Sequence, residues 1–285
     1  MIIDCHVHLN NYADERTDRL KENLAELKFQ MRRNRVDMSI ILTSYEVSPG
    51  RPSTKAVVEA VRAADNLFVV AGISYLNFVQ HDLDEIREFI VERKVVGLKL
   101  YPGYEPFYPS DERLNPVYRL AAETGIPVMI HCGDTYTPKG KLKFSHPLNV
   151  DEVAVEHPDV NFLICHLGNP WVRDTMEVVY KNANVYTDIS GLVLGNFSDR
   201  FEKYMSKQLQ EMLIYGAEPD KCLYGTDWPI SSMESYIDFM ESLNIPEKDK
   251  EKMFYQNAIT LYKLPVQSPP GSGFFTRRPF FGSKE

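Results

Sequence analysis

Residues 2–9 read Ile-Ile-Asp-Cys-His-Val-His-Leu, an apolar and β-branched run that carries two histidines two positions apart. Such a run predicts a buried strand. An open, doubly wound α/β sheet would place a glycine-rich phosphate-binding turn directly after its first strand. Residues 6–10 are His-Val-His-Leu-Asn instead, which disfavours the open sheet and favours another arrangement of strands.

Seven further runs of this kind follow, spaced by about 31 residues, the length of one strand–helix unit. The eight predicted strands cover residues 2–9, 38–45, 67–75, 95–102, 127–134, 161–168, 184–191 and 222–229. Helical patterns separate and follow them at residues 13–35, 54–64, 83–91, 116–124, 149–156, 172–182, 200–215, 232–243 and 247–262. Strands that alternate with helices predict a parallel sheet, and eight such strands close best as an α/β fold of the (β/α)₈ TIM-barrel type.

Composition limits the class of protein. The chain has 285 residues, of which 44% are hydrophobic and 25% charged, and these values exclude wholesale disorder. A net charge of −8 argues against nucleic acid or an anionic membrane surface as a partner. Without a secretory signal, a run of about 20 apolar residues or a CxxC pair, we expect a cytoplasmic protein with reduced thiols.

No linker rich in Gly, Ser or Pro interrupts the series, so residues 1–264 are predicted to form one barrel domain. Residues 265–285 differ, with four prolines, three glycines and four phenylalanines. Exposed Phe gains about 1.5–3 kcal/mol by burial, so we expect this tail to dock. Its target is either its own barrel or a neighbouring chain in a homodimer.

Polar side chains gather where the predicted strands end, which is where barrel enzymes place their active sites. Because side chains alternate along a strand, Asp4, His6 and His8 are expected on one face and Cys5 and Val7 on the other. Two histidines at this spacing can chelate one metal ion, although they can equally be satisfied core residues. The other strand-end residues are Lys99, His131, His166 and Asp227.

Packing does not explain charged and imidazole groups at five converging strand ends, because an unpaired buried charge costs several kcal/mol. A divalent metal ion held by nitrogen and carboxylate ligands resolves this cost, and zinc is the expected ion. Cys5, Cys132 and Cys165 adjoin site histidines, but alternation predicts that they face the surrounding helices as small buried hydrophobes.

The chain resembles the amidohydrolase superfamily, and within it the amidohydrolase-2 branch that contains aminocarboxymuconate-semialdehyde decarboxylase. The resemblance covers residues 1 to about 263. It rests on five phrases: Ile-Asp-Cys-His-Val-His at 3–8, Gly-Leu-Lys-Leu-Tyr-Pro at 97–102, Pro-Val-Met-Ile-His-Cys-Gly at 127–133, Cys-His-Leu-Gly at 165–168 and Tyr-Gly-Thr-Asp-Trp-Pro at 224–229. It implies a metallo-dependent-hydrolase barrel.

The resemblance implies that His6, His8, His131 and Asp227 bind one divalent metal, with His166 close to a bound water. Lys99 matches a position that is a carboxylated, metal-bridging lysine in other branches, whereas its neighbours here look like the mononuclear type. A single metal is therefore expected.

Hydrolysis of a small amide, lactone or ester by metal-activated water is the main functional expectation, with Asp227 and His166 as catalytic residues. The alternative is non-oxidative decarboxylation of a small, aromatic carboxylic acid, which would use the same ligands. A catalytically dead binding barrel is a third reading, and the complete set of strand-end residues argues against it. Tyrosines and tryptophans in the loops suggest a partly aromatic pocket, and the substrate-binding candidates are Lys99, Tyr101, Arg51 and Trp228.

Overall fold

The computed structural model describes residues 1–216 and 218–265. Eight parallel strands pair in chain order, from the first strand to the eighth. They are β1 (Ile3–Val7), β2 (Met38–Leu42), β3 (Leu67–Gly72), β4 (Val95–Leu100), β5 (Val128–Ile130), β6 (Phe162–Ile164), β7 (Val185–Asp188) and β8 (Cys222–Leu223). The TIM barrel predicted from the sequence is confirmed. The strands are shorter than predicted because the polar residues that follow them belong to loops.

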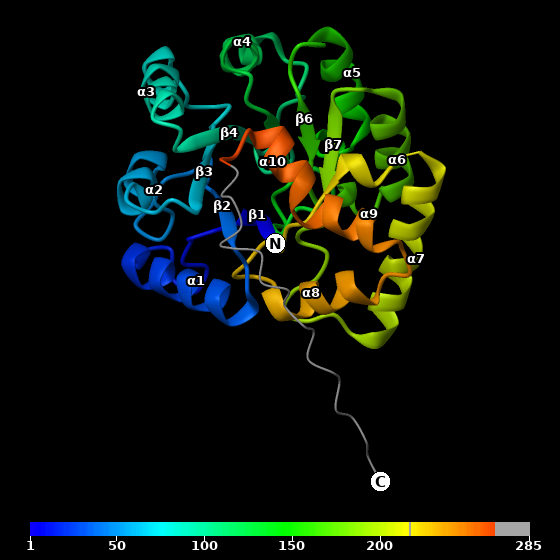
Figure 1. Ribbon diagram of the computed structural model, residues 1–285. Coiled ribbons are helices and arrows are strands. Elements are labelled where there is room, and N and C mark those ends of the chain that lie inside the picture. Colours follow the sequence, from blue (N-terminus) through cyan, green and yellow to red (C-terminus); the bar gives the residue numbers. More distant parts are fainter. Residues whose placement is uncertain (217, 266–285) are drawn as a thin grey trace.

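Most of the helices surround the strands in a ring (Figure 1). They are α1 (Leu20–Asn34), α2 (Thr54–Val61), α3 (Gln80–Val91), α4 (Asn115–Thr124), α5 (Leu148–Glu156), α6 (Val172–Lys181), α7 (Asp199–Tyr215), α8 (Met233–Ser242), α9 (Glu247–Glu251) and α10 (Asn257–Tyr262). None of the helices in the described ranges is both long and apolar enough to cross a membrane.

Two predicted helices differ in the structure. The first begins at Leu20 rather than at residue 13, because the Asp14 carboxylate accepts hydrogen bonds from the backbone N and side chain of Arg16 and from the Thr17 hydroxyl. Local bonds of this kind compete with helix formation. The last predicted helix, 247–262, is divided into α9 and α10 by a π-helical stretch at Lys252–Gln256.

Hydrogen bonds between β1 and the segment after β8 close the barrel. Cys5 N donates to Tyr224 O, and His8 N donates to Trp228 O at 2.7 Å. The buried Asp4 carboxylate strengthens this seam, because it accepts bonds from the Thr226 backbone N and hydroxyl at 3.0 and 2.7 Å. Burial raises the pKa of Asp4 to about 7.

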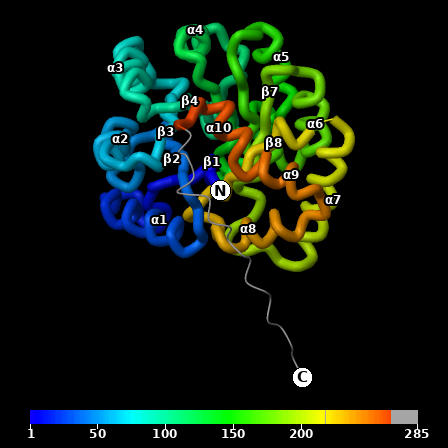
Figure 2. The backbone as a smooth tube through the Cα atoms, in the orientation of Figure 1, coloured from blue at the N-terminus to red at the C-terminus, as the bar shows by residue number. Residues whose placement is uncertain are grey.

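The buried apolar side chains form two clusters. The outer core joins alternate strand residues, such as Val69 and Ile130, to the helices. The inner core fills the barrel and includes Ile40, Met129 and Leu163, together with Leu261 and Tyr262 of α10. Figures 1 and 2 show α10 lying across the end of the barrel near the N-terminus. Because this end is closed by α10, the site must open at the carboxyl ends of the strands.

The predictions about the tail lie outside the described residues, which end at residue 265. The docking of residues 266–285 and their exchange in a homodimer stay predictions.

Candidate metal centre and active site

His6 and His8 enter the site from the end of β1 through an irregularity in that strand. Pairing with β2 shifts register between Asp4 and Val7. Ile3 and Cys5 belong to the inner core, whereas Val7, two residues further on, belongs to the outer core, so the irregularity changes the face on which side chains lie. The expected regular alternation was therefore wrong for this strand: Cys5 lies inside the barrel, and Asp4 faces the seam rather than the histidines.

Asp227 completes the group from the loop after β8. Its backbone N donates to His6 O at 2.7 Å, and its φ of +67° turns the chain at this point. One carboxylate oxygen, Oδ1, lies 3.1 Å from His8 Nε2 and 3.8 Å from His6 Nε2. These three predicted ligands have ligand atoms within 4.8 Å of one another, and all three residues are buried.

The contacts of Nδ1 in His6 and His8 show what their Nε2 atoms and the Asp227 carboxylate can bind. His6 Nδ1 lies 2.9 Å from Asp188 Oδ2, and His8 Nδ1 lies 2.9 Å from Leu42 O. Both partners can only accept, so each neutral ring carries its proton on Nδ1 and a free electron pair on Nε2. Two electron pairs thus face the Asp227 carboxylate with no hydrogen between them. A cation fits this donor set, and one divalent metal satisfies it.

The pKa shifts of Asp227 and His6 favour an ionised carboxylate and a neutral imidazole. Burial alone would raise the pKa of Asp227, but the interactions with His8, His6 and His166 outweigh it and hold this pKa well below its usual range. Burial lowers the pKa of His6 to about 4, against the opposing effect of Asp188. Asp227 and His6 are therefore held as a carboxylate and a neutral imidazole, the forms that bind metals.

His131 lies beside this group but is turned differently. It follows β5, and its Nε2 lies 2.9 Å from Asp134 O, a bond that leaves Nδ1 as the free nitrogen. Neither of the two clusters of possible ligand atoms among the described residues includes it. Its ring centroid is 5.1 Å from that of His166. The structure thus brings three of the four predicted ligands together, and His131 remains adjacent to them.

His166 is brought into the site by a break at the end of β6. Its φ is +62° and that of Leu167 is +52°, so the strand does not continue. The ring centroid lies 4.9 Å from that of His6. Burial lowers the pKa of His166. Left-handed backbone at non-glycine residues is costly and is concentrated at functional sites.

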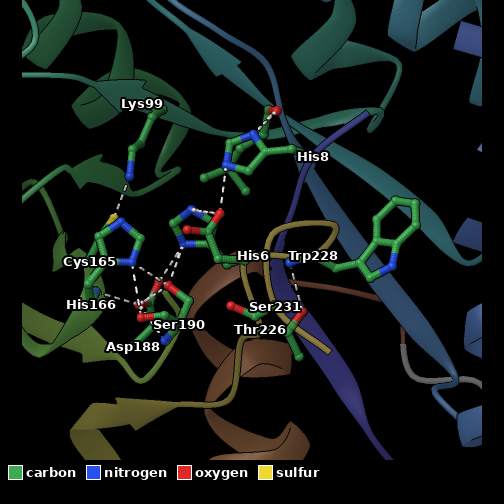
Figure 3. A network of polar contacts seen from close by, with 12 residues as sticks. His6, His8, Lys99, Cys165, His166, Asp188, Ser190, Thr226, Trp228 and Ser231 are labelled. Atoms are coloured by element: carbon green, nitrogen blue, oxygen red, sulfur yellow. Dashed lines mark hydrogen bonds and ion pairs between the residues drawn. The ribbon is translucent and has the colours of Figure 1, made fainter. Parts of the chain in front are cut away.

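Asp188 and Ser190, at the end of β7, are site residues that the sequence interpretation missed (Figure 3). The buried Asp188 carboxylate contacts His6, the His166 backbone N and the Ser190 hydroxyl at 2.9, 2.8 and 2.6 Å. Burial alone would raise the pKa of Asp188, but His6 and its other partners hold it well below its usual range. The available signal was the same as in the other strands: a charged residue after an apolar run, shortly before a glycine, Gly191.

Lys99 and Cys165 lie together in the barrel interior. Lys99 is 1% exposed, and its Nζ lies 2.6 Å from Cys165 Sγ. The prediction that Cys165 faces the helices was wrong. Leu163 and Cys165 both point into the barrel, and the extended backbone ends at His166. Cys132 does belong to the outer core, as predicted. Burial raises the pKa of Cys165 to about 12, which keeps it a thiol.

Three tyrosines form an aromatic wall beside His131. The Tyr104 ring lies 4.8 Å from that of His131, and the Tyr45 ring lies 5.1 and 6.2 Å from those of Tyr101 and Tyr104. The Tyr101 hydroxyl donates to Thr43 O at 2.6 Å, so its ring rather than its proton is available to a ligand. An aromatic wall next to His131, a candidate metal ligand, fits the partly aromatic pocket expected from the sequence.

The two other candidate substrate contacts have different surroundings. Arg51 is partly buried and forms an ion pair with Glu15, at 2.6 Å from Nη2 to Oε1. Trp228 packs in the outer core, and Figure 3 shows its indole directed away from the histidines; its contact with a substrate stays a prediction that this position does not favour. The backbone of Trp228 pairs with Val7 of β1 in the seam, directly after the left-handed turn at Asp227.

Known proteins with this architecture include decarboxylases. The chain is 27% identical over 190 residues to the gamma-resorcylate decarboxylase of Polaromonas sp. (strain JS666 / ATCC BAA-500), a match that covers 56% of this chain. The match covers 55% of that relative, so the chain spans about half of the relative's length.

Two solved structures share the fold. An uncharacterized TIM-barrel protein, Bb4693 from Bordetella bronchiseptica, superposes with a TM-score of 0.72 at 21% identity, covering 92% of this chain and 98% of its own. The 5-carboxyvanillate decarboxylase of Novosphingobium aromaticivorans, solved with manganese and 4-hydroxy-3-methoxy-5-nitrobenzoic acid, gives a TM-score of 0.68 at 14% identity, with 93% and 96% covered.

The family itself is shown by a separate match that extends over almost the whole barrel. The family model described as amidohydrolase matches residues 3–264, which include every site residue described above. The resemblance inferred from the five sequence phrases is thereby confirmed. The chain belongs to the amidohydrolase family.

Proposed function

We propose that this protein is a metal-dependent, non-oxidative decarboxylase of a small aromatic carboxylic acid. The observation that carries the proposal is the convergence of His6 Nε2, His8 Nε2 and Asp227 Oδ1, each an electron-pair donor. Hydrolysis was the main expectation from the sequence. The named relatives favour the alternative, because the curated relative and one solved neighbour are both called decarboxylases of aromatic acids.

The metal proposed here is a single divalent ion on His6, His8 and Asp227, with His131 as the fourth candidate ligand. When bound, such an ion neutralises a substrate carboxylate and withdraws electron density from it. We propose zinc, since imidazole nitrogen supplies two of the three converging donors. Manganese, named with the solved neighbour, is the competing ion. The Lys99 ammonium beside Cys165 argues against a second cation there.

In decarboxylation the bond between the carboxyl carbon and the ring breaks, carbon dioxide leaves, and a proton takes its place on the ring carbon. In this proposal Asp227 and His166 hold and move that proton. The tyrosine wall formed by Tyr45, Tyr101 and Tyr104 would orient a planar ring and exclude water from the reacting carbon. Arg51 would contact a substrate carboxylate only after releasing its ion-pair partner Glu15.

The proposal is tested by incubating zinc- or manganese-loaded protein with a panel of hydroxybenzoates, lactones and amides. Release of carbon dioxide and of hydrolysis products is measured on the same samples. Carbon dioxide from an aromatic acid supports the proposal. Turnover confined to lactones or amides would overturn it in favour of hydrolysis.

The metal assignment has its own test. Replacing both His6 and His8 by Ala should remove metal, measured by plasma emission spectroscopy, and all turnover. The control is His81→Ala, an exposed histidine of α3. A doubly substituted protein that retained one equivalent of metal would show that the ligand assignment is wrong.

Homodimerisation also stays a prediction. Light scattering on the full chain and on a chain lacking residues 266–285 tests whether the tail contributes. An unchanged monomer in both cases would refute an exchanged arm.

A further inference from the structure

The geometry points to Asp188 and Ser190 as positioning residues that set the imidazole tautomers of the site and make His166 a proton acceptor in its resting state. Neither side chain is a member of the converging metal-ligand group. Asp188 ends β7, Ser190 follows it, and both residues contact His6 and His166 (Figure 3). The catalytic role of His166 rests on the proposed function, whereas the tautomers can be measured without it.

The Ser190 hydroxyl lies at the centre of the contacts. Its Oγ is 2.6 Å from Asp188 Oδ1, and since a carboxylate only accepts, the hydroxyl proton is directed there. The same Oγ is 2.9 Å from His6 Nδ1 and 2.9 Å from His166 Nδ1. With its one proton already donated, Ser190 can only accept from these nitrogens. Both imidazoles must therefore carry their proton on Nδ1.

A second contact fixes the same tautomer for His166. Its Nδ1 is 3.1 Å from the Ser190 carbonyl oxygen, which is also only an acceptor. The neutral ring thus has a free electron pair on Nε2. Such a ring can take a proton from a substrate hydroxyl or a water, but it cannot give one until it has done so. Within the proposed reaction, His166 accepts first and donates later.

Asp188 anchors the arrangement from the other side. Its Oδ1 accepts from the backbone N atoms of His166 and Ser190 at 2.8 and 3.2 Å, while its Oδ2 takes the His6 Nδ1 proton at 2.9 Å. One buried carboxylate therefore orients a metal-ligand candidate and the left-handed turn that carries His166. Partners of this kind change activity or metal affinity by 10- to 100-fold in other metal sites.

The test combines ¹⁵N-histidine NMR with kinetics on the zinc-loaded, full-length protein. Long-range proton–nitrogen correlation shows which ring nitrogen carries the proton, and His166→Gln assigns the signal. Wild type should show His166 protonated on Nδ1. Ser190→Ala should mix the two tautomers and lower kcat by about 10- to 100-fold, with KM and metal content unchanged.

Ser39→Ala is the matched control, because the Ser39 hydroxyl is also buried but has no hydrogen-bond partner. It should alter neither the spectrum nor kcat. Asp188→Asn should additionally weaken metal binding, and Ser190→Ala remains informative if that variant does not fold.

Two results would overturn the inference: a wild-type His166 protonated on Nε2, or a Ser190→Ala protein with an unchanged tautomer and kcat. The expected tautomers without any carbon dioxide release would overturn the proposed function alone and leave the positioning assignment standing.

Discussion

At the residue scale, the site depends on a few residues whose backbone is in the left-handed conformation. Asp227, His166 and Gly191 have φ values of +67°, +62° and +62°. This conformation is strained for Asp227 and His166, which are not glycines. It places their side chains where a continuing strand would not. Such positions leave little room for substitution.

Asp227→Asn should reduce turnover far more than it weakens metal binding. An amide oxygen can still coordinate, but it cannot hold or move a proton near neutral pH, so the loss should fall on kcat. The expected decrease is about 10²–10⁴-fold. Metal content and steady-state kinetics measured on the same preparation test this, and an Asn variant that kept about a tenth of wild-type kcat would remove Asp227 from proton transfer.

Gly191→Ala should impair the site through contact rather than through backbone strain alone. A Cβ at this position would lie 2.5 Å from His166 Nδ1 and 2.8 Å from Asp227 Oδ2, so both side chains would have to move. We expect kcat to fall more than about tenfold, as small misplacements near the reacting groups do.

Gly195→Ala is the control for this variant. Gly195 has φ +73°, and an added Cβ would meet nothing within 4 Å. Equal losses of activity in the two variants would show that backbone strain, and not displacement of His166 and Asp227, is responsible.

At the scale of elements, α10 closes one end of the barrel while the strand ends form the site at the other. Tyr262 is buried in the inner core, and its hydroxyl lies 3.2 Å from Met129 Sδ. Removing its ring leaves a cavity beneath the strands. Because the site lies at the opposite end, stability and activity should separate.

Tyr262→Ala should therefore destabilise the protein by about 3–5 kcal/mol, the usual cost of deleting a buried aromatic ring. Urea unfolding measures the loss, and kcat of the folded fraction should stay close to that of wild type. Thr260→Ala, on the exposed side of the same helix, should change stability by less than about 0.5 kcal/mol. Similar midpoints for both variants would contradict the role of α10.

At the scale of the whole molecule, the buried histidines couple stability to pH. Burial lowers the pKa of His6, His131 and His166 in the folded protein. Below the unfolded-state value near 6.5 the unfolded chain therefore binds more protons, and stability falls as the pH falls. Asp4, with its pKa raised to about 7, acts in the opposite direction but is a single group.

Metal-free protein should accordingly be less stable at pH 5 than at pH 7. The comparison is made by urea unfolding after treatment with a chelator, so that metal binding does not contribute. Equal stability at the two pH values, or greater stability at pH 5, would contradict the burial of three neutral histidines.

The sequence by itself determined the barrel and most of the residues that gather at its open end. Eight apolar runs at regular spacing are enough for this, because period and burial are local properties of the chain. Where β5 continued regularly, alternation also placed His131 and Cys132 on the correct faces. The polar residues after the strands then marked the end at which chemistry is possible.

Only the tertiary structure decided the details that depend on irregular backbone and on contacts between distant strands. In β1 the register shift separates the inward Cys5 from the outward Val7, and at the end of β6 the left-handed turn begins directly after Cys165, which lies beside Lys99. The positioning role of Asp188 and Ser190 depends on their hydrogen bonds to His6, which is more than 180 residues away in the chain. An argument from strand periodicity holds only for regular strands and uses only neighbours in sequence. A bulge, a strand end or a hydrogen bond across the barrel therefore cannot be deduced from it.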